Sequence, residues 1–125
     1  MKKWLFVLLL VSHPAIGGRE DGEFLTGNKL TDGLWISMNT AFLVDWAQTR
    51  HIADHPERWA ERNTDLGRHP TTGEVNRYFL SYALGVNALY FFTPGEFKPY
   101  LSSVYIIPRY DAVTHNYEAG IKLEF

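Results

Sequence analysis

The sequence predicts a small all-α protein, a bundle of about three helices that follows an N-terminal signal and ends in a short extended C-terminal tail. Two observations predict this class. Apolar residues dominate three segments of helix length, and proline or a Pro-Gly pair separates the segments. The length of 125 residues allows one domain. The three segments are residues 33–53, 75–92 and 99–116.

The N-terminus is typical of an export signal. Lys2 and Lys3 supply the positive start, residues 4–11 are apolar, and residues 15–17 form a small-x-small cleavage motif. An uncleaved signal anchor is the alternative, although the apolar run is shorter than the about 20 residues that a spanning helix needs. We therefore assign residues 1–17 to a signal peptide or signal anchor, 18–32 to a flexible linker and 33–125 to a single helical domain.

The first predicted helix spans residues 33–53. Thr31 or Asp32 can cap its start, and Pro56 ends it, because the residue before a proline is pushed away from helical geometry. Asn39 can bond back to its own backbone or across a helix interface. At about 1.5 Å per residue the helix would be about 31 Å long, close to the thickness of a bilayer core.

The other two helices have their own start and stop signals. Residues 71–74, Thr-Thr-Gly-Glu, match a capping box and predict the start of the helix at 75–92. The third helix, 99–116, contains Pro108, which would kink it. From Tyr117 onward apolar residues alternate with polar or small ones, which predicts a strand or an extended tail.

Segment length and charge placement favour a transmembrane arrangement. By the positive-inside rule, the arginine-bearing loop at 50–77 would lie in the cytoplasm. The alternative is a small outer-membrane β-barrel, because residues 118–125 resemble the terminal signal of such barrels; residues 35–46 and 78–92 lack the alternation that a barrel requires. We expect three helices packed in or on the inner membrane of the cell envelope, with the outer membrane or the periplasm as alternatives, and the sequence leaves open whether the helices span the membrane or lie on it.

Composition excludes several classes of function. The net charge of −2 gives no strong field for nucleic acid, so no such partner is expected. The absence of cysteine excludes disulfides, thiolate metal sites and a thiol nucleophile. No phosphate-binding glycine loop occurs, and we predict no cofactor. His51 and His55 have the i, i+4 spacing that can share a metal ion, but no third ligand follows at a recognised spacing. We therefore interpret them as solvated histidines and predict no metal.

Asp45 is the most informative residue of the first helix. A carboxylate inside an apolar helix is unfavourable unless something satisfies it, and Gln48 and Thr49 lie on the same helical face. One interpretation is an acid, base or ligand-binding carboxylate that these neighbours position. The other is a structural network that locks the helices together, with Asp45 paired to Arg77 or Arg109.

A second polar cluster follows in the loop. Glu61 and Asn63 could turn back over the face of Asp45, where two carboxylates and an amide would suit metal binding or acid–base work. A surface helix end with an asparagine turn is the alternative. His69 before Pro70 indicates a rigid turn or a base. The candidate polar site comprises Asp45, Gln48, Thr49, Arg50, Glu61, Asn63, His69 and Asn116.

The order of these residues carries a resemblance. Asp-x-x-x-Thr, then Glu-x-Asn-Pro-x-Leu-Gly, then His-Pro and an aromatic helix, resembles small, mostly uncharacterised helical membrane proteins of bacteria and phages. The resemblance covers residues 33–92, with a looser match at 115–120, and Thr64 departs from it where the pattern has proline. It implies a helical, membrane-associated fold and no established activity. The matching positions are Asp45, Thr49, Glu61, Asn63, Leu66, Gly67, His69 and Pro70.

We therefore expect a membrane-associated structural or interaction protein of the cell envelope, built around a buried polar network. Its expected partners are membrane lipids, with a second copy of the chain or another envelope protein as further candidates. The alternative is an envelope enzyme or ligand-binding protein that acts on a lipid-like or small polar substrate through Asp45 and Glu61.

Overall fold

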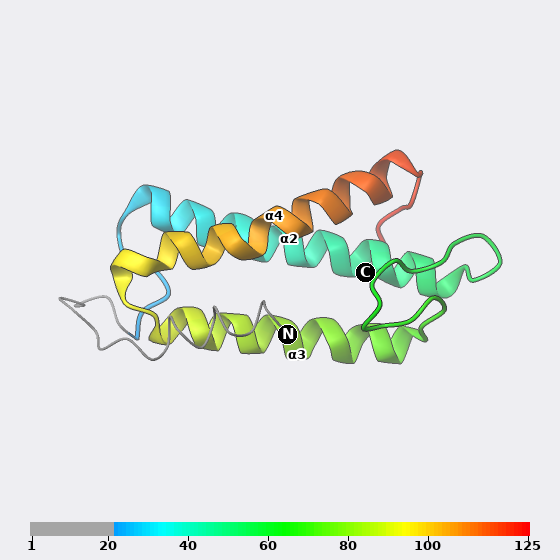
Figure 1. Ribbon diagram of the computed structural model, residues 1–125, viewed down its shortest axis with the longest axis horizontal. Coiled ribbons are helices and arrows are strands. Elements are labelled where there is room, and N and C mark those ends of the chain that lie inside the picture. Colours follow the sequence, from blue (N-terminus) through cyan, green and yellow to red (C-terminus); the bar gives the residue numbers. More distant parts are fainter. Residues whose placement is uncertain (1–21) are drawn as a thin grey trace.

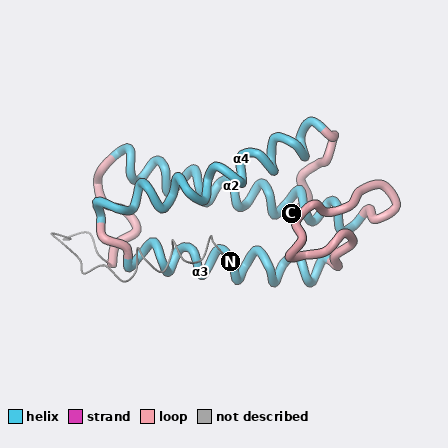
Figure 2. The backbone as a smooth tube through the Cα atoms, viewed as in Figure 1, coloured by secondary structure: helices cyan, strands magenta, loops and turns pink. Residues whose placement is uncertain are grey.

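The computed structural model describes residues 22–125, which form three long helices and no strand. The predicted all-α bundle is confirmed for this part of the chain, whereas the predicted signal, 1–17, and the first residues of the linker lie outside it (Figures 1 and 2). The elements are α2 (Lys29–Asp54), α3 (Thr72–Phe92), the 3-10 turn η1 (Gly95–Phe97) and α4 (Lys98–Glu118).

The three helices run along one long axis. Helix α4 packs chiefly on α2, while α3 runs alongside these two helices and contacts α4 least (Figure 1). After α4 the chain turns back, and the backbone N–H of Glu124 donates to the carbonyl of Ala47 at 3.0 Å. The C-terminal tail is therefore held against the last turns of α2.

Helix α2 begins at Lys29 rather than at residue 33. The cap is Asn28, whose side chain accepts a hydrogen bond from the backbone N–H of Thr31 at 3.0 Å. Asp32 instead accepts from the backbone N–H of Thr26 at 2.8 Å, so it stabilises the loop before the helix. Either residue can cap a helix by its chemistry, and the earlier asparagine takes this position because the loop occupies Asp32.

The capping box at the start of α3 is confirmed. The backbone N–H of Glu74 donates to the Thr71 hydroxyl at 3.2 Å, and the N–H of Thr71 donates to the Glu74 carboxylate at 2.8 Å. The two bonds satisfy donors that a helix start otherwise leaves without partners. Just before, Gly67 has a positive φ of 79°, which glycine adopts in a turn without steric cost.

The end of α4 differs from the prediction, because the alternating region starts as helix. Tyr117 and Glu118 are helical, and Gly120, with φ of 85°, ends the helix. The N–H of Ile121 closes the turn on the carbonyl of Asn116 at 3.0 Å. Residues 121–125 are extended, as the tail alternative predicted, and within the described chain they form no strand.

Helices α2 and α3 are joined by a small apolar core and an amide pair. Met38, Phe42 and Val86 are buried together. Asn39 and Asn87 lie across the interface, where the Asn87 amide donates to Asn39 Oδ1 at 2.8 Å. Asn39 also donates to the carbonyl of residue 35 at 3.0 Å, so it bonds both to its own backbone and across the interface.

No helix between residues 22 and 125 combines the length and the apolar character needed to cross a membrane, which corrects the transmembrane arrangement expected above. The reason lies in the polar side chains that interrupt each apolar segment. Asp45 and Gln48 interrupt α2, Asn76 and Asn87 interrupt α3, and Arg109 interrupts α4.

Candidate functional site

The centre of the candidate site is a buried ion pair between α2 and α4. Arg109 Nη1 donates to Asp45 Oδ2 at 2.5 Å. The side chain of Asp45 is only 6% exposed and that of Arg109 only 11% exposed, so both charged groups are largely removed from water. Of the two arginines that the sequence offered as partners, the structure therefore has Arg109. Removing either partner would leave an uncompensated buried charge.

Aromatic rings surround the guanidinium group. The Cζ atom of Arg109 lies 4.7 Å from the ring centroid of Tyr82, 5.1 Å from that of Phe42 and 5.4 Å from that of Phe79. Each ring can attract the cation through its quadrupole, and together they exclude water from it. Helices α2, α3 and α4 thus all contribute to one charge centre.

The predicted face of α2 extends the network. The Thr49 hydroxyl donates weakly to Asp45 Oδ1 at 3.4 Å. Gln48 donates to the carbonyl of Val113 at 3.2 Å and accepts from the Asn116 amide at 3.3 Å. Asn116 therefore joins the site from the end of α4, as a partner of Gln48. Asp45, Gln48, Thr49 and Asn116 are all buried.

Burial opposes both charges of the pair, and each charge supports the other. Burial raises the pKa of Asp45 above 3.8, and the charge and hydrogen bond of Arg109 counteract part of the rise. Burial, the largest single cause, would lower the pKa of Arg109, but the charge and hydrogen bond of Asp45 together with the contact with Tyr78 outweigh it, and the net direction is upward. An arginine stays protonated in proteins, so the contact is an ion pair.

The loop cluster meets the ion pair through Tyr78. The Asn63 amide donates to the Tyr78 hydroxyl at 2.9 Å. The same hydroxyl accepts a hydrogen bond from Arg109, which helps to raise the pKa of Arg109 after burial, which lowers it, and the raising contribution of Asp45. The backbone N–H of Asn63 donates to Glu61 Oε1 at 2.8 Å, and the N–H of Asp65 donates to Asn63 Oδ1 at 3.0 Å. Asn63 thus makes the expected asparagine turn and also reaches the network.

Glu61 is the chemically unusual member. Its Oε2 atom is buried and has no hydrogen-bond partner among the described residues. Burial raises the pKa of Glu61, the N–H of Asn63 lowers it, and the nearby charge of Asp45 raises it further. Two carboxyl groups with raised pKa values close to one another can serve as an acid–base pair or simply strain the fold.

Two predicted members lie elsewhere. Arg50 turns toward α3, where its Nη1 donates to Asn76 Oδ1 at 3.3 Å, and the Trp46 indole donates to the same oxygen at 2.9 Å. His69 is exposed in the turn before α3. Neither contacts the Asp45 group, so the candidate site is smaller than the set that the sequence predicted.

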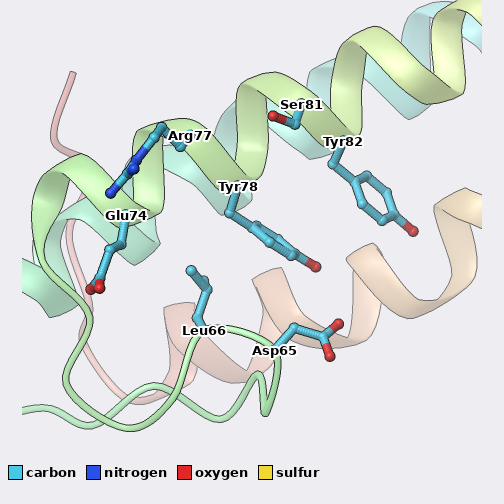
Figure 3. A pocket seen from close by; sticks show the side chains of 7 residues that line it. All are labelled: Asp65, Leu66, Glu74, Arg77, Tyr78, Ser81 and Tyr82. Carbon is cyan, nitrogen blue, oxygen red and sulfur yellow. The ribbon is translucent and has the colours of Figure 1, made fainter.

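A groove of about 550 Å³ opens beside the network, between the loop and α3 (Figure 3). Tyr78 and Tyr82 form part of its wall, and both also lie against Arg109. The groove therefore gives solvent a path to the aromatic rings that enclose the ion pair. Its lining residues are Asp65, Leu66, Glu74, Arg77, Tyr78, Ser81 and Tyr82.

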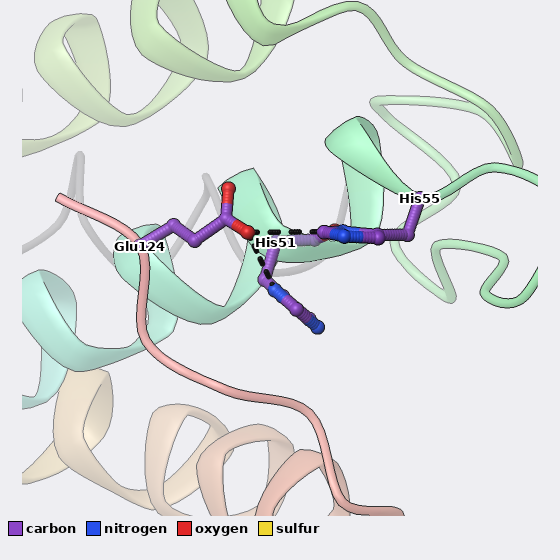
Figure 4. Close-up of side chains that lie close together, drawn as sticks. All are labelled: His51, His55 and Glu124. Atoms are coloured by element: carbon purple, nitrogen blue, oxygen red, sulfur yellow. Dashed lines mark hydrogen bonds and ion pairs between the residues drawn. The ribbon is translucent and has the colours of Figure 1, made fainter.

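A second cluster lies at the C-terminal end of α2 (Figure 4). His51 Nδ1 is 2.7 Å from Glu124 Oε1, and His55 Nδ1 is 3.7 Å from the same oxygen. Asp54 lies next to them: a hydrogen bond with Glu124, and a second with the Thr72 hydroxyl, hold the pKa of Asp54 below 3.8.

Sequence reasoning did not identify the aromatic residues around Arg109 or the contact of the C-terminal tail with α2. Phe42, Phe79 and Tyr82 read as ordinary core or interface residues, because nothing local shows that they share a cation. The contact of Glu124 with His51 joins residues 73 positions apart, which no spacing rule covers. Comparison of the chain with protein-family models, curated proteins and solved structures gave no match.

Proposed function

We propose that the protein is a small membrane-associated interaction protein of the cell envelope, whose buried polar network fixes three helices that present apolar side chains outward. The observation that carries this proposal is the distribution of polarity. A charged pair, Asp45 and Arg109, lies in the interior, while large apolar side chains lie on the outside of each helix. Such an arrangement suits apolar surroundings better than water.

The outer face of α3 supports this proposal most clearly. Leu80, Leu84 and Phe92 are 51%, 64% and 72% exposed. Their spacing of four and eight residues places them along one side of the helix, with Ala88, also exposed, between the last two. Isolated exposed apolar residues are common in proteins, but a continuous row along a helix is typical of a contact surface.

The other helices carry shorter rows of the same kind. Ile36 and Leu43 of α2 are seven residues apart and more than half exposed, and so are Tyr100 and Ile107 of α4. Lipid acyl chains are the partner that apolar rows on three sides of a bundle fit best, because a single protein partner would cover one side. The small net charge points to apolar rather than electrostatic attraction.

Flotation of the full chain with phosphatidylcholine vesicles tests this proposal. We expect the protein to float with the vesicles at both low and high salt, because apolar contact is not screened. Leu84→Glu should weaken flotation, because it places a charge in the row of α3. Thr64→Glu is the matched control, since it adds the same charge in an exposed loop.

Failure of the wild-type chain to float would contradict the lipid partner. If Leu84→Glu instead abolished a dimer in size-exclusion chromatography while wild-type flotation was absent, the row would be a protein interface, and the lipid proposal would be wrong.

The pairing of Glu61 with Asp45 favours a second candidate, an envelope enzyme or binding protein for a lipid-like or small polar substrate. The supporting observation is the buried Oε2 of Glu61, which has no hydrogen-bond partner among the described residues and lies near the Asp45 charge. Under this candidate, a donor group of the substrate would bond to Glu61 Oε2. A stable but inactive Glu61→Gln protein would favour it.

A further inference from the structure

The cluster at the end of α2 brings three potential metal ligands together. His51 lies in the last turn of α2 and His55 caps the helix, and their ring centroids are 4.2 Å apart. Glu124 reaches them from the tail, and one ligand atom from each residue lies within 4.8 Å of the others (Figure 4). The sequence offered the histidine pair without a third ligand, and the return of the tail supplies it.

The tail holds Glu124 in place independently of any ion. Its backbone N–H donates to the carbonyl of Ala47 at 3.0 Å, and Ile121 is buried three residues earlier. The position of Glu124 therefore does not depend on its side-chain contacts. A site whose ligands are already in position loses little ordering entropy when an ion binds.

The polar contacts of the histidines suit ligation. His55 Nδ1 lies 2.8 Å from the carbonyl oxygen of His51, which can only accept, so Nδ1 carries the proton. The neutral ring then keeps a lone pair on Nε2, and a hydrogen bond of this kind is what usually orients a ligating histidine. His51 and Glu124 are separated by 2.7 Å, with a proton between them that an ion would displace.

The spread of the ligand atoms suits a small tetrahedral ion. Bonds of about 2.0 to 2.1 Å place neighbouring ligands of zinc about 3.3 Å apart. His51 Nδ1 lies 2.7 Å from Glu124 Oε1, somewhat closer than that value, and one ligand atom of His55 lies within 4.8 Å of the other two. All three side chains are partly exposed, so small rotations can close them on an ion and leave a fourth position for water.

We propose that His51, His55 and Glu124 bind a divalent transition-metal ion of the zinc type, which fixes the C-terminal tail to the end of α2. Two imidazoles and one carboxylate are a ligand set that zinc accepts and that calcium and magnesium, which prefer oxygen, do not. Asp54, the last residue of α2, accepts a hydrogen bond from the Thr72 hydroxyl, which ties the end of α2 that carries the histidines to the start of α3. This proposal stands apart from lipid binding.

Calorimetric titration of the untagged, chelator-treated full chain with Zn²⁺ tests the proposal. We expect one ion per chain, with no comparable signal from Mg²⁺ or Ca²⁺. His55→Ala and Glu124→Gln should each weaken binding by at least about tenfold, since even the loss of a residue that only supports a ligand has that effect. His115→Ala is the matched control, because this histidine is exposed at the end of α4, away from the cluster.

A second measurement separates ligation from folding. Zn²⁺ should raise the thermal unfolding temperature of the wild-type chain and of His115→Ala, but not that of His55→Ala. His55 is preferred to His51 for this test, because replacing His51 would also remove its contact with Glu124 at 2.7 Å. The proposal is wrong if the wild-type chain shows no saturable zinc binding, or if His55→Ala and Glu124→Gln bind zinc as tightly as the wild type.

Discussion

Arg109 has more interactions within the network than any other single residue described above. It pairs with Asp45 from α2, touches three aromatic rings and bonds to Tyr78, which the loop holds through Asn63. An isolated cation at this position would be strongly unfavourable, and the Asp45 carboxylate compensates for it. The arrangement therefore makes the correct packing of α2, α3 and α4 a condition for burying the charge.

This role predicts a large effect of Asp45→Asn. The change keeps the shape of the side chain and leaves Arg109 buried without its counter-charge, so the free energy of unfolding should fall by about 3 to 5 kcal/mol. Chemical unfolding followed by circular dichroism measures it. The double change Asp45→Leu with Arg109→Met should recover much of the loss, because no buried charge remains.

The same variant separates the two candidate functions. Loss of stability in Asp45→Asn, with recovery in the double variant, would support a structural network. An Asp45→Asn protein as stable as the wild type would show that the ion pair does not lock the helices, and the acid–base interpretation would then gain support.

Glu61 predicts a pH dependence of the opposite sign to that of an ordinary ion-paired carboxylate. Burial is the main cause that raises its folded pKa above 4.5. Its contribution to stability is therefore complete below its unfolded pKa and is lost as the pH rises through the folded value. At neutral pH Glu61→Gln should therefore be more stable than the wild type. The gain should be only a few degrees in unfolding temperature, because Glu61 is partly exposed and solvent screens its charge.

Thermal unfolding as a function of pH checks this prediction. The advantage of Glu61→Gln should shrink and vanish as the pH falls below 4.5, where the wild-type side chain is itself protonated. Glu57→Gln, an exposed glutamate of the same loop, should show no such trend. Equal stability of Glu61→Gln and wild type across the whole range would refute the strained carboxylate.

The candidate site could be predicted only where the chemistry is local. Asp45 was identifiable because a carboxylate in an apolar helix must be satisfied, and Thr49 and Gln48 followed from helical periodicity. The choice between Arg77 and Arg109 could not be made, because it depends on which helices pack together. The contact of Glu124 with His51 depends on the return of the tail after Gly120, which no periodicity encodes.

At the scale of elements, segment length and capping chemistry predicted the helices well, and their ends less well. The start of α3 agrees with its capping box because both partners lie within four residues. The start of α2 was wrong by one turn, since Asn28 and Asp32 are equally good caps and only the loop decides between them. The alternation after Tyr117 predicted a strand or a tail, but a strand needs a neighbouring strand to pair with.

Helices α3 and α4 are not held to α2 by the same kind of contact. Helices α2 and α4 share the ion pair and the contacts of Gln48. Helix α3 is fixed to α2 by the small apolar core and by amides, Asn87 with Asn39 and Asn76 with Trp46. Half-buried hydrogen bonds of this kind contribute less than a closely packed apolar interface. We therefore expect α3 to be the element that separates first.

At the scale of the whole molecule, one charged pair lies inside while large apolar side chains are exposed on all three helices, so apolar burial provides less of the stabilisation than in an ordinary globular domain. The apolar core formed by Met38, Phe42 and Val86 is small. Polar contacts therefore account for much of the specificity of helix packing, because they are directional and fix one register between neighbouring helices. Such a molecule should open in steps rather than all at once, since its polar contacts are grouped by helix pair.

Hydrogen exchange of the full chain, followed by mass spectrometry, tests this stepwise opening. Amides of α3 should exchange faster than those of α2 and α4, because a local opening exposes α3 without breaking the Asp45–Arg109 pair. Asn87→Ala removes the amide that bonds to Asn39 and accepts from the Trp35 indole at 2.8 Å, so exchange in α3 should accelerate while α4 stays protected. Ser81→Ala, an exposed change on the same helix, should leave the pattern unaltered.

If Asn87→Ala accelerated exchange equally in all three helices, the bundle would open as one cooperative unit, and the ion pair would have to stabilise α3 as firmly as it stabilises α4.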